Sequence, residues 1–199
     1  MILDSKLFFI FETLLLFVLP QFLIQVYPPL VHYRLLVMAL GLIYVFLVAK
    51  SQHWNLTTLG FNFIFLPSVM FISIFLGLAL LLQPSLVFVT EVAQEAQNYP
   101  AVLVLLFYIL ISVPLQEILF RGFYINRLKL ISTNKYFLVI FSAFIFGLIH
   151  LPLQNKLIAL GTFLVSIWWA HLFLKHRSLL LSFISHALIG GSLVLLTLL

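Results

Sequence analysis

Ionisable side chains lie inside several long apolar stretches of this sequence, where such groups are rare. Glu117 and Arg121 lie in one apolar run, His150 ends a second and His186 lies within a third. Each of them costs about 2.5–3.5 kcal/mol to insert into a membrane, so each needs a partner or a function. A carboxylate can act as general base toward water, and histidines can orient that water, stabilise an oxyanion or bind a metal. The pattern therefore predicts a hydrolytic site built from three helices.

The helices that carry these residues must bring them together. Glu117 and Arg121 are four residues apart, so they share a helix face and can form an ion pair that keeps the carboxylate charged and oriented. At 1.5 Å per residue, Glu117 and His186 lie roughly 15 Å and roughly 13.5 Å from the basic residues that mark the nearest ends of their segments. His150 lies roughly 22 Å deep by the same count. We expect the three side chains to share one broad layer inside the membrane.

A metal site is an alternative use of the same residues. Glu117, His150 and His186 would supply one carboxylate and two imidazoles, a donor set that suits Zn²⁺ with one open position. The long sequence gaps between them are not typical of a metal motif. Zinc is therefore one mechanism, and hydrolysis without a cofactor is the other.

Each residue also has a structural interpretation. Glu117 and Arg121 could form an ion pair that only locks helices together. His150 could cap a helix C-terminus, where the helix dipole favours a positive group, and His186 could hydrogen-bond across helices. A serine triad at Ser185 is excluded because no aspartate follows Asp4, and the absence of cysteine excludes a cysteine nucleophile.

The composition requires a lipid environment. Of the 199 residues, 64% are hydrophobic and only 8% are charged, and the mean hydropathy is +1.26. A soluble domain carries about 25% charged residues, so this chain has too little polar surface to coat a water-soluble globule. Its pI of about 9.6 comes from basic residues in short scattered clusters, so we expect the lipid bilayer and no nucleic acid as a partner.

Seven apolar segments are predicted to cross the membrane. They cover about residues 7–27, 33–49, 61–83, 100–130, 136–151, 157–174 and 178–198. We expect an all-α polytopic fold in one integral membrane domain, 1–199. Its N-terminal helices occupy 1–99, and the motif-bearing core occupies 100–198.

The basic residues predict an orientation. One set of segment ends carries Lys6, Lys50, Arg127, Lys129, Lys135, Lys175 and Arg177, and the opposite set carries Arg34 and Lys156 with the acidic pair Glu91 and Glu95. By the positive-inside rule the N-terminus is cytoplasmic and the C-terminus is outside. Glu12 is expected near the cytoplasmic headgroups. Interfacial aromatic residues are expected at the cytoplasmic ends, namely Trp54, Trp168, Trp169 and Tyr136.

Three short motifs in residues 100–198 resemble those of the CAAX-protease and bacteriocin-processing (Abi) family. Gln116-Glu117-Ile-Leu-Phe-Arg121 resembles the first motif, two adjacent glutamates followed by three residues and arginine. Phe146-Gly-Leu-Ile-His150 matches the second, and His186-Ala-Leu-Ile-Gly190 resembles the third, histidine, three residues and asparagine. Order, spacing and placement on apolar helices all agree.

The resemblance implies an intramembrane endopeptidase with a cavity open to the cytoplasm. Members of the family cleave prenylated proteins near the C-terminus, process peptides, or serve in immunity and sorting. The first glutamate and the two histidines are regarded as catalytic, with a glutamate-activated water, or in an older view a metal, as the mechanism. We therefore expect a membrane-associated or prenylated peptide or protein as substrate. The compact form of the chain predicts a prokaryotic inner membrane as the location.

This sequence departs from the family pattern at two positions. Gln116 stands where the first glutamate is expected, and an amide cannot act as a base. Gly190 stands in place of the asparagine. Adjacent helical residues point about 100° apart, so Glu117 would need a distortion, such as a kink at Pro114, to replace its neighbour.

Three functions remain open from the sequence. An intramembrane endopeptidase is the first. The second is a catalytically impaired relative that acts as a binding, immunity or sorting partner. The third, a small transporter, usually shows repeats with discontinuous helices in both halves, whereas polar residues here cluster in the C-terminal half.

Overall fold

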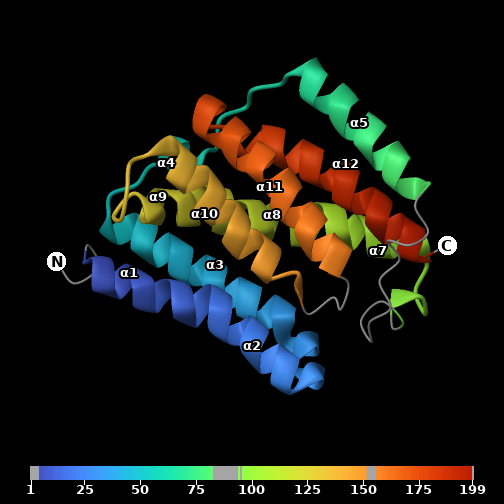
Figure 1. Ribbon diagram of the computed structural model, residues 1–199, viewed down its shortest axis with the longest axis horizontal. Coiled ribbons are helices and arrows are strands. Elements are labelled where there is room, and N and C mark those ends of the chain that lie inside the picture. The colour runs from blue at the N-terminus through green and yellow to red at the C-terminus, as the bar shows by residue number, and fades with distance from the viewer. Residues whose placement is uncertain (1–4, 83–93, 95, 152–155, 199) are drawn as a thin grey trace.

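Helices form the whole framework of the protein. The computed structural model describes residues 5–82, 94, 96–151 and 156–198, and every regular element within these ranges is helical (Figure 1). The all-α prediction is therefore confirmed for this part of the chain. The predicted acidic pair, Glu91 and Glu95, lies outside the described residues.

Four helices are long and apolar enough to cross a membrane. The first is Lys6–Val26, which consists of α1 (Lys6–Thr13), a π-helical turn and α2 (Leu19–Val26). The others are Ala101–Leu128, α11 (Lys156–His176) and α12 (Leu179–Leu198). Three shorter apolar helices match the other predicted segments: α3 (Arg34–Ser51), α5 (Pro67–Leu81) and α10 (Lys135–Leu148). The number of membrane crossings stays a prediction, because these three fall short of a full span. The helix expected from residue 61 begins at Pro67, which has the φ angle of a first helical residue.

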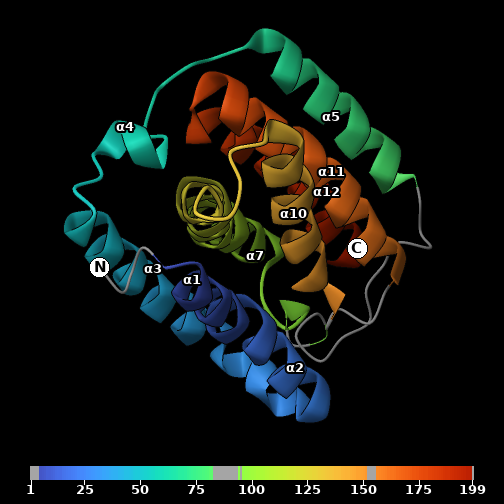
Figure 2. The ribbon, with the colours of Figure 1, turned by 60° about the vertical axis from the view of Figure 1, so that its left-hand side comes forward.

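The motif-bearing helix runs through the centre of the bundle. It consists of α7 (Ala101–Phe107), a π-helical turn, α8 (Val113–Glu117), a second π-helical stretch and α9 (Ile125–Leu128). Figure 2 views this helix nearly end-on, with α1, α3, α10 and α12 arranged around it. Residues 119–128 are all buried, so the C-terminal half of the helix is encased in protein.

Close helix packing fixes the elements around that centre. The α10 helix packs against α11, and α5 packs against α12. A Cβ at Gly147 would lie 2.9 Å from Phe163, and one at Gly77 would lie 2.6 Å from the Ser192 hydroxyl. Small residues therefore allow these pairs to approach closely, as is common between membrane helices.

Large apolar side chains cover the outside of the bundle. Phe63 is 87% exposed, Leu7 is 80% exposed and Phe75 is 71% exposed. Lipid would remove such side chains from water, as the composition predicts.

The basic segment ends gather at one end of the bundle. The start of α1, the ends of α3, α9 and α11, and the start of α10 all lie at the left in Figure 1. A hydrogen-bonded cluster joins several of them there: Asn126 donates to the carbonyl of Thr58, in the short α4 (Leu56–Leu59), and accepts from Arg177 at 3.2 Å. The gathering of these ends agrees with the predicted topology, whereas the side of the membrane they face stays a prediction.

Candidate active site

A π-helical turn precedes the predicted catalytic residues. Pro114 has no N–H, and the N–H of Val113 bonds to the carbonyl of Tyr108, five residues earlier, instead of four. The expected distortion before Glu117 thus takes the form of a widened turn, Tyr108–Ser112. A second π-helical stretch, Ile118–Tyr124, begins directly after Glu117 and contains Arg121.

Glu117 is a buried carboxylate with two partners. Its Oε1 accepts a hydrogen bond from His186 Nδ1 at 2.7 Å and lies 3.3 Å from the guanidinium of Arg121. Only 1% of Glu117 is exposed, and it is not among the residues that line the large cavity described below. The structure brings Glu117, Arg121 and His186 together, but it does not place Glu117 where it could touch a water molecule in that cavity.

Arg121 is fully buried and is held by groups other than the carboxylate. Its guanidinium donates to the Ser166 hydroxyl at 2.7 Å and lies over the ring of Phe146, 4.3 Å from the centroid. An arginine desolvated over aromatic faces gains cation–π stabilisation. Its position close to Glu117 is therefore fixed by the helices α10 and α11 as well as by the ion pair.

The ring of His186 is fixed by an aromatic neighbour. Trp169 stacks on it with 4.4 Å between centroids, and the indole N–H of Trp169 donates to Ser185 at 2.7 Å. Trp169 is only 2% exposed. Its prediction as an interfacial aromatic residue is wrong, because it belongs to the face of α11 that packs on α12.

His150 lies beside the same aromatic group. Its Nδ1 donates to the carbonyl of Phe146 at 2.7 Å, and the two rings lie 4.7 Å apart. Phe146 also contacts His186 edge to face at 5.6 Å. Phe146 therefore lies between His150 and His186, in agreement with the prediction that the two histidines share one layer of the membrane.

Gln116 faces a different direction from Glu117. Its amide nitrogen donates to the Ser112 hydroxyl at 3.0 Å, while its Oε1 has no hydrogen-bond partner among the described residues. Gln116 lines the cavity. The widened turn has not rotated Glu117 into its neighbour's place, because Gln116 lines the cavity and Glu117 does not. A catalytic role of Glu117 stays a prediction.

A large apolar cavity adjoins these residues. It has a volume of about 850 Å³, which lies within the usual size range of ligand sites. Tyr108, Gln116, His150 and His186 line it together with apolar side chains of the N-terminal helices and of α12. The N-terminal helices therefore form part of the wall.

The predicted zinc ligands do not form a metal site. Among the described residues no three histidine or acidic side chains lie close enough to hold a metal ion. Glu117 Oε1 already accepts from the protonated Nδ1 of His186, so these two atoms bind each other.

Comparison with protein-family models shows which family has this set of motifs. Residues 98–191 match the model of the type II CAAX prenyl endopeptidase Rce1-like family. This part of the chain belongs to the CAAX-protease family. The match contains all three motifs and every predicted site residue, and residues 1–97 lie outside it. No curated protein and no solved structure matches the chain significantly.

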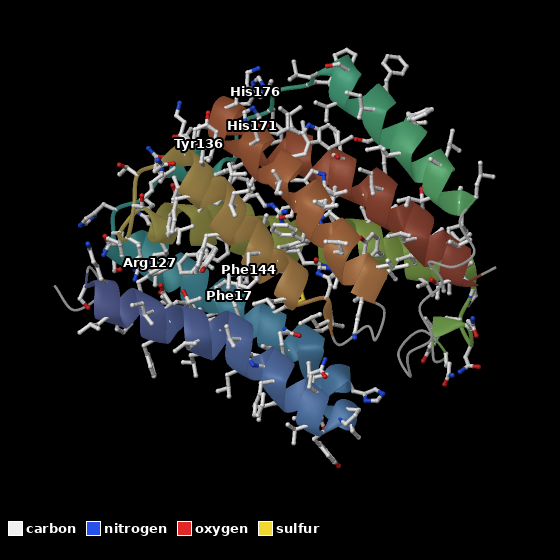
Figure 3. All side chains as sticks on the ribbon, viewed as in Figure 1. Phe17, Arg127, Tyr136, Phe144, His171 and His176 are labelled. Carbon is white, nitrogen blue, oxygen red and sulfur yellow. The ribbon has the colours of Figure 1, made fainter. Side chains whose placement is uncertain are left out.

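The family and the apolar helices together make this an integral membrane protein with a CAAX-protease domain. A membrane-associated substrate is the coarse expectation that follows from that family. Two further histidines lie away from this site: His171 is exposed, and Figure 3 shows it with His176 toward the C-terminal end of α11.

Sequence reasoning missed a second buried acidic group. Glu12 is only 3% exposed, and it pairs with Arg127 at 2.8 Å and with the Tyr44 hydroxyl at 2.5 Å. Both side chains are buried within the bundle and bonded to each other, while the expected depth of Glu12 near the headgroups and of Arg127 at the membrane surface stays a prediction. An acid in the middle of an apolar helix was the available signal, but its partner is 115 residues away.

Proposed function

We propose that this protein is an endopeptidase that hydrolyses a peptide bond of a lipidated, membrane-associated substrate. The observation that carries the proposal is the Glu117–His186 pair, whose imidazole lies on the wall of a cavity of about 850 Å³. The CAAX-protease family of residues 98–191 supports the reaction class.

In this proposal His186 is the general base and Glu117 positions it. A carboxylate only accepts hydrogen bonds, so the 2.7 Å contact places a proton on His186 Nδ1. The neutral ring then has its lone pair on Nε2, where it can accept a proton from water. A buried carboxylate in the same relation to a histidine supports the imidazolium that forms in serine proteases.

The reaction balances with water as the only co-reactant. The water oxygen attacks the peptide carbonyl carbon while His186 Nε2 takes one of its protons, and a tetrahedral oxyanion forms. His186 then returns that proton to the leaving nitrogen, the C–N bond breaks, and a carboxylic acid and an amine result. Arg121 neutralises the charge of Glu117, so the site carries a net charge of only +1 when His186 is protonated.

Two neighbours have supporting roles. Because His150 Nδ1 donates to a carbonyl, the neutral ring has an accepting Nε2 that can orient the second hydrogen of the water. Gln116 lines the cavity, and its buried Oε1 has no hydrogen-bond partner among the described residues; after a side-chain rotation toward the cavity it can accept a backbone N–H of the substrate and so align the scissile bond. Gln116 would then bind substrate in place of acting as a base.

The cavity lining supports a lipidated substrate. Leu16, Ile24 and Met38 of the N-terminal helices line the cavity together with Leu193 of α12, so an alkyl or isoprenoid chain would leave water on entering. The catalytic groups lie at the wall of the same cavity, which would place a bond next to the lipid at His186.

The test uses full-length protein in lipid nanodiscs with fluorogenic peptides of one sequence in farnesylated, geranylgeranylated and unlipidated forms. We expect wild type and His171→Ala, which alters an exposed histidine on α11, to cleave a lipidated form. Glu117→Gln, His150→Ala and His186→Ala should each lose at least about 100-fold in kcat. A chelator should leave the rate unchanged, and loss of cleavage on chelation would replace this mechanism by a metal-dependent one.

One observation favours a non-catalytic binding function as the second candidate. Gln116 lies on the cavity wall where the family pattern has a glutamate. If wild type is silent toward the whole panel and Gln116→Glu cleaves, the natural protein is an inactive relative that binds lipidated partners.

A further inference from the structure

Tyr108 approaches a helix of the site at an unusually short distance. A Cβ built on Gly190 would overlap the Tyr108 hydroxyl oxygen and would lie 2.9 Å from the ring carbon that carries it. No real side chain fits there beside the tyrosine. The hydroxyl therefore occupies the space into which any residue at position 190 other than glycine would extend.

This space adjoins the proposed base. Position 190 lies one helical turn after His186, and the same Cβ would lie 3.3 Å from His186 Cδ2. The Tyr108 ring meets the His186 ring edge to face at 6.1 Å, and both residues line the cavity. The described residues offer the Tyr108 hydroxyl no hydrogen-bond partner, so its proton is available to a ligand.

The widened turn explains how the hydroxyl arrives at this place. Tyr108 begins the π-helical turn Tyr108–Ser112, which precedes Pro114. A π-turn shifts the direction of the side chains that precede it relative to those that follow. Tyr108 and Gln116 thereby both reach the cavity from one helix.

We propose that Tyr108 is the hydrogen-bond donor for the oxyanion of the tetrahedral intermediate, in the place that Gly190 leaves empty. The inference rests on the proposed function. During attack the carbonyl oxygen gains the negative charge, and the phenol donates its O–H to that oxygen without transferring the proton. Donors that act on the developing charge stabilise the transition state more than the bound substrate.

Tyr108→Phe removes the hydroxyl and keeps the ring. We expect kcat to fall about 100- to 1000-fold while KM changes less than about threefold, as for the loss of one oxyanion donor. Tyr136→Phe is the matched control, because Tyr136 is 83% exposed near the start of α10 and is not among the residues that line the cavity. Its kinetics should equal those of wild type.

A rescue separates a donor from a merely structural ring. Tyr108→Ala vacates the space next to position 190, and Tyr108→Ala combined with Gly190→Asn places an amide donor there. The double variant should regain at least about tenfold in kcat over Tyr108→Ala, since a side-chain amide can also donate to an oxyanion.

A binding measurement distinguishes failure of this inference from failure of the proposed function. A lipidated peptide phosphonate copies the charge and shape of the tetrahedral intermediate, and the matching uncleaved peptide does not. Tyr108→Phe should weaken phosphonate affinity at least tenfold and leave peptide affinity unchanged, even if wild type proves unable to cleave any substrate. Equal phosphonate affinity in Tyr108→Phe and wild type overturns the role of Tyr108, whatever the cleavage assay shows.

Discussion

Glu12 and Glu117 are both buried carboxylates with an arginine beside them, and they differ in how their oxygens are used. Glu12 gives one oxygen to Tyr44 and the other to Arg127. Glu117 gives Oε1 to both His186 and Arg121, while Oε2 has no hydrogen-bond partner by distance and angle among the described residues. Tyr44 and Arg127, which bind Glu12, keep their protons. His186, which binds Glu117, can take up and release a proton.

Distance from the cavity does not show which of the two carboxylates has a catalytic role. Glu12 lies on the cavity wall, whereas Glu117 reaches the cavity only through His186. The useful criterion is therefore the chemistry of the partner. A tyrosine and an arginine complete the ion pair that joins α1, α3 and α9, and an imidazole connects Glu117 to the cavity.

The comparison also explains why both arginines are buried. Arg127 and Arg121 are each no more than 1% exposed, and each is adjacent to its carboxylate. A buried ion pair adds little net stability, but removing one partner leaves an uncompensated charge. Substitution of the two acids should therefore affect stability alike and activity very differently.

The largest expected effect is on catalysis by Glu117→Gln. An amide can donate to His186 Nδ1, and this would move the ring proton to Nε2 and block it as a base. We expect kcat to fall about 10³- to 10⁴-fold, as when the orienting carboxylate of a catalytic histidine is made an amide. The measurement is kcat per folded molecule on the best lipidated peptide. Glu12→Gln, the matched variant, should stay within about twofold of wild type, and a comparable loss there would remove the distinction between the two groups.

The next effect concerns stability at the other carboxylate. Glu12→Gln removes the carboxylate that pairs with the buried Arg127 at 2.8 Å, so the free energy of unfolding should fall by about 3–5 kcal/mol. Replacing the pair together, Glu12→Gln with Arg127→Met, should recover most of that loss because both charges of this pair are then removed. Reversible unfolding in mixed micelles measures both changes. If the double variant is less stable than Glu12→Gln, the ion pair itself holds the N-terminal helices.

Local spacing allowed part of this site to be predicted. The four-residue step from Glu117 to Arg121 fixes their shared helix face, and the cost of burying His186 in an apolar run indicates that it must have a partner. The helix positions followed from apolar length in the same way. These are properties of single segments, so they can be obtained from a sequence.

The remaining features depend on how helices rotate against each other. Trp169 and Arg127 look interfacial in a linear sequence, because each lies near the end of an apolar run. Their burial arises from α11 packing against α12 and from α1 packing against the central helix. Tyr108 is still harder to predict, since its place depends on a glycine 82 positions later and on a π-helical turn.

A smaller effect is expected at Gln116, which has the proposed role of aligning substrate. Gln116→Ala removes the acceptor for a substrate N–H and should raise KM about fivefold while kcat stays within about twofold, as for one hydrogen bond worth about 1 kcal/mol. The measurement is a full substrate titration. Ser112→Ala is the companion variant, because it removes the acceptor of the Gln116 amide but keeps the Gln116 oxygen, and it should change KM less. A fall in kcat at constant KM would instead place Gln116 in the chemical step.

The smallest effect tests whether the Glu12 group is purely structural. Tyr44→Phe deletes the donor to Glu12 Oε1 and leaves the ion pair with Arg127 in place, so the free energy of unfolding should fall by about 1 kcal/mol. Activity per folded molecule should not change, because no proton passes through this group in the proposed mechanism. Tyr44 also lines the cavity, so the same variant shows whether its hydroxyl contacts substrate. A raised KM without loss of stability would mean that the hydroxyl binds substrate more strongly than it binds Glu12, and the two carboxylates would then both belong to the functional cavity.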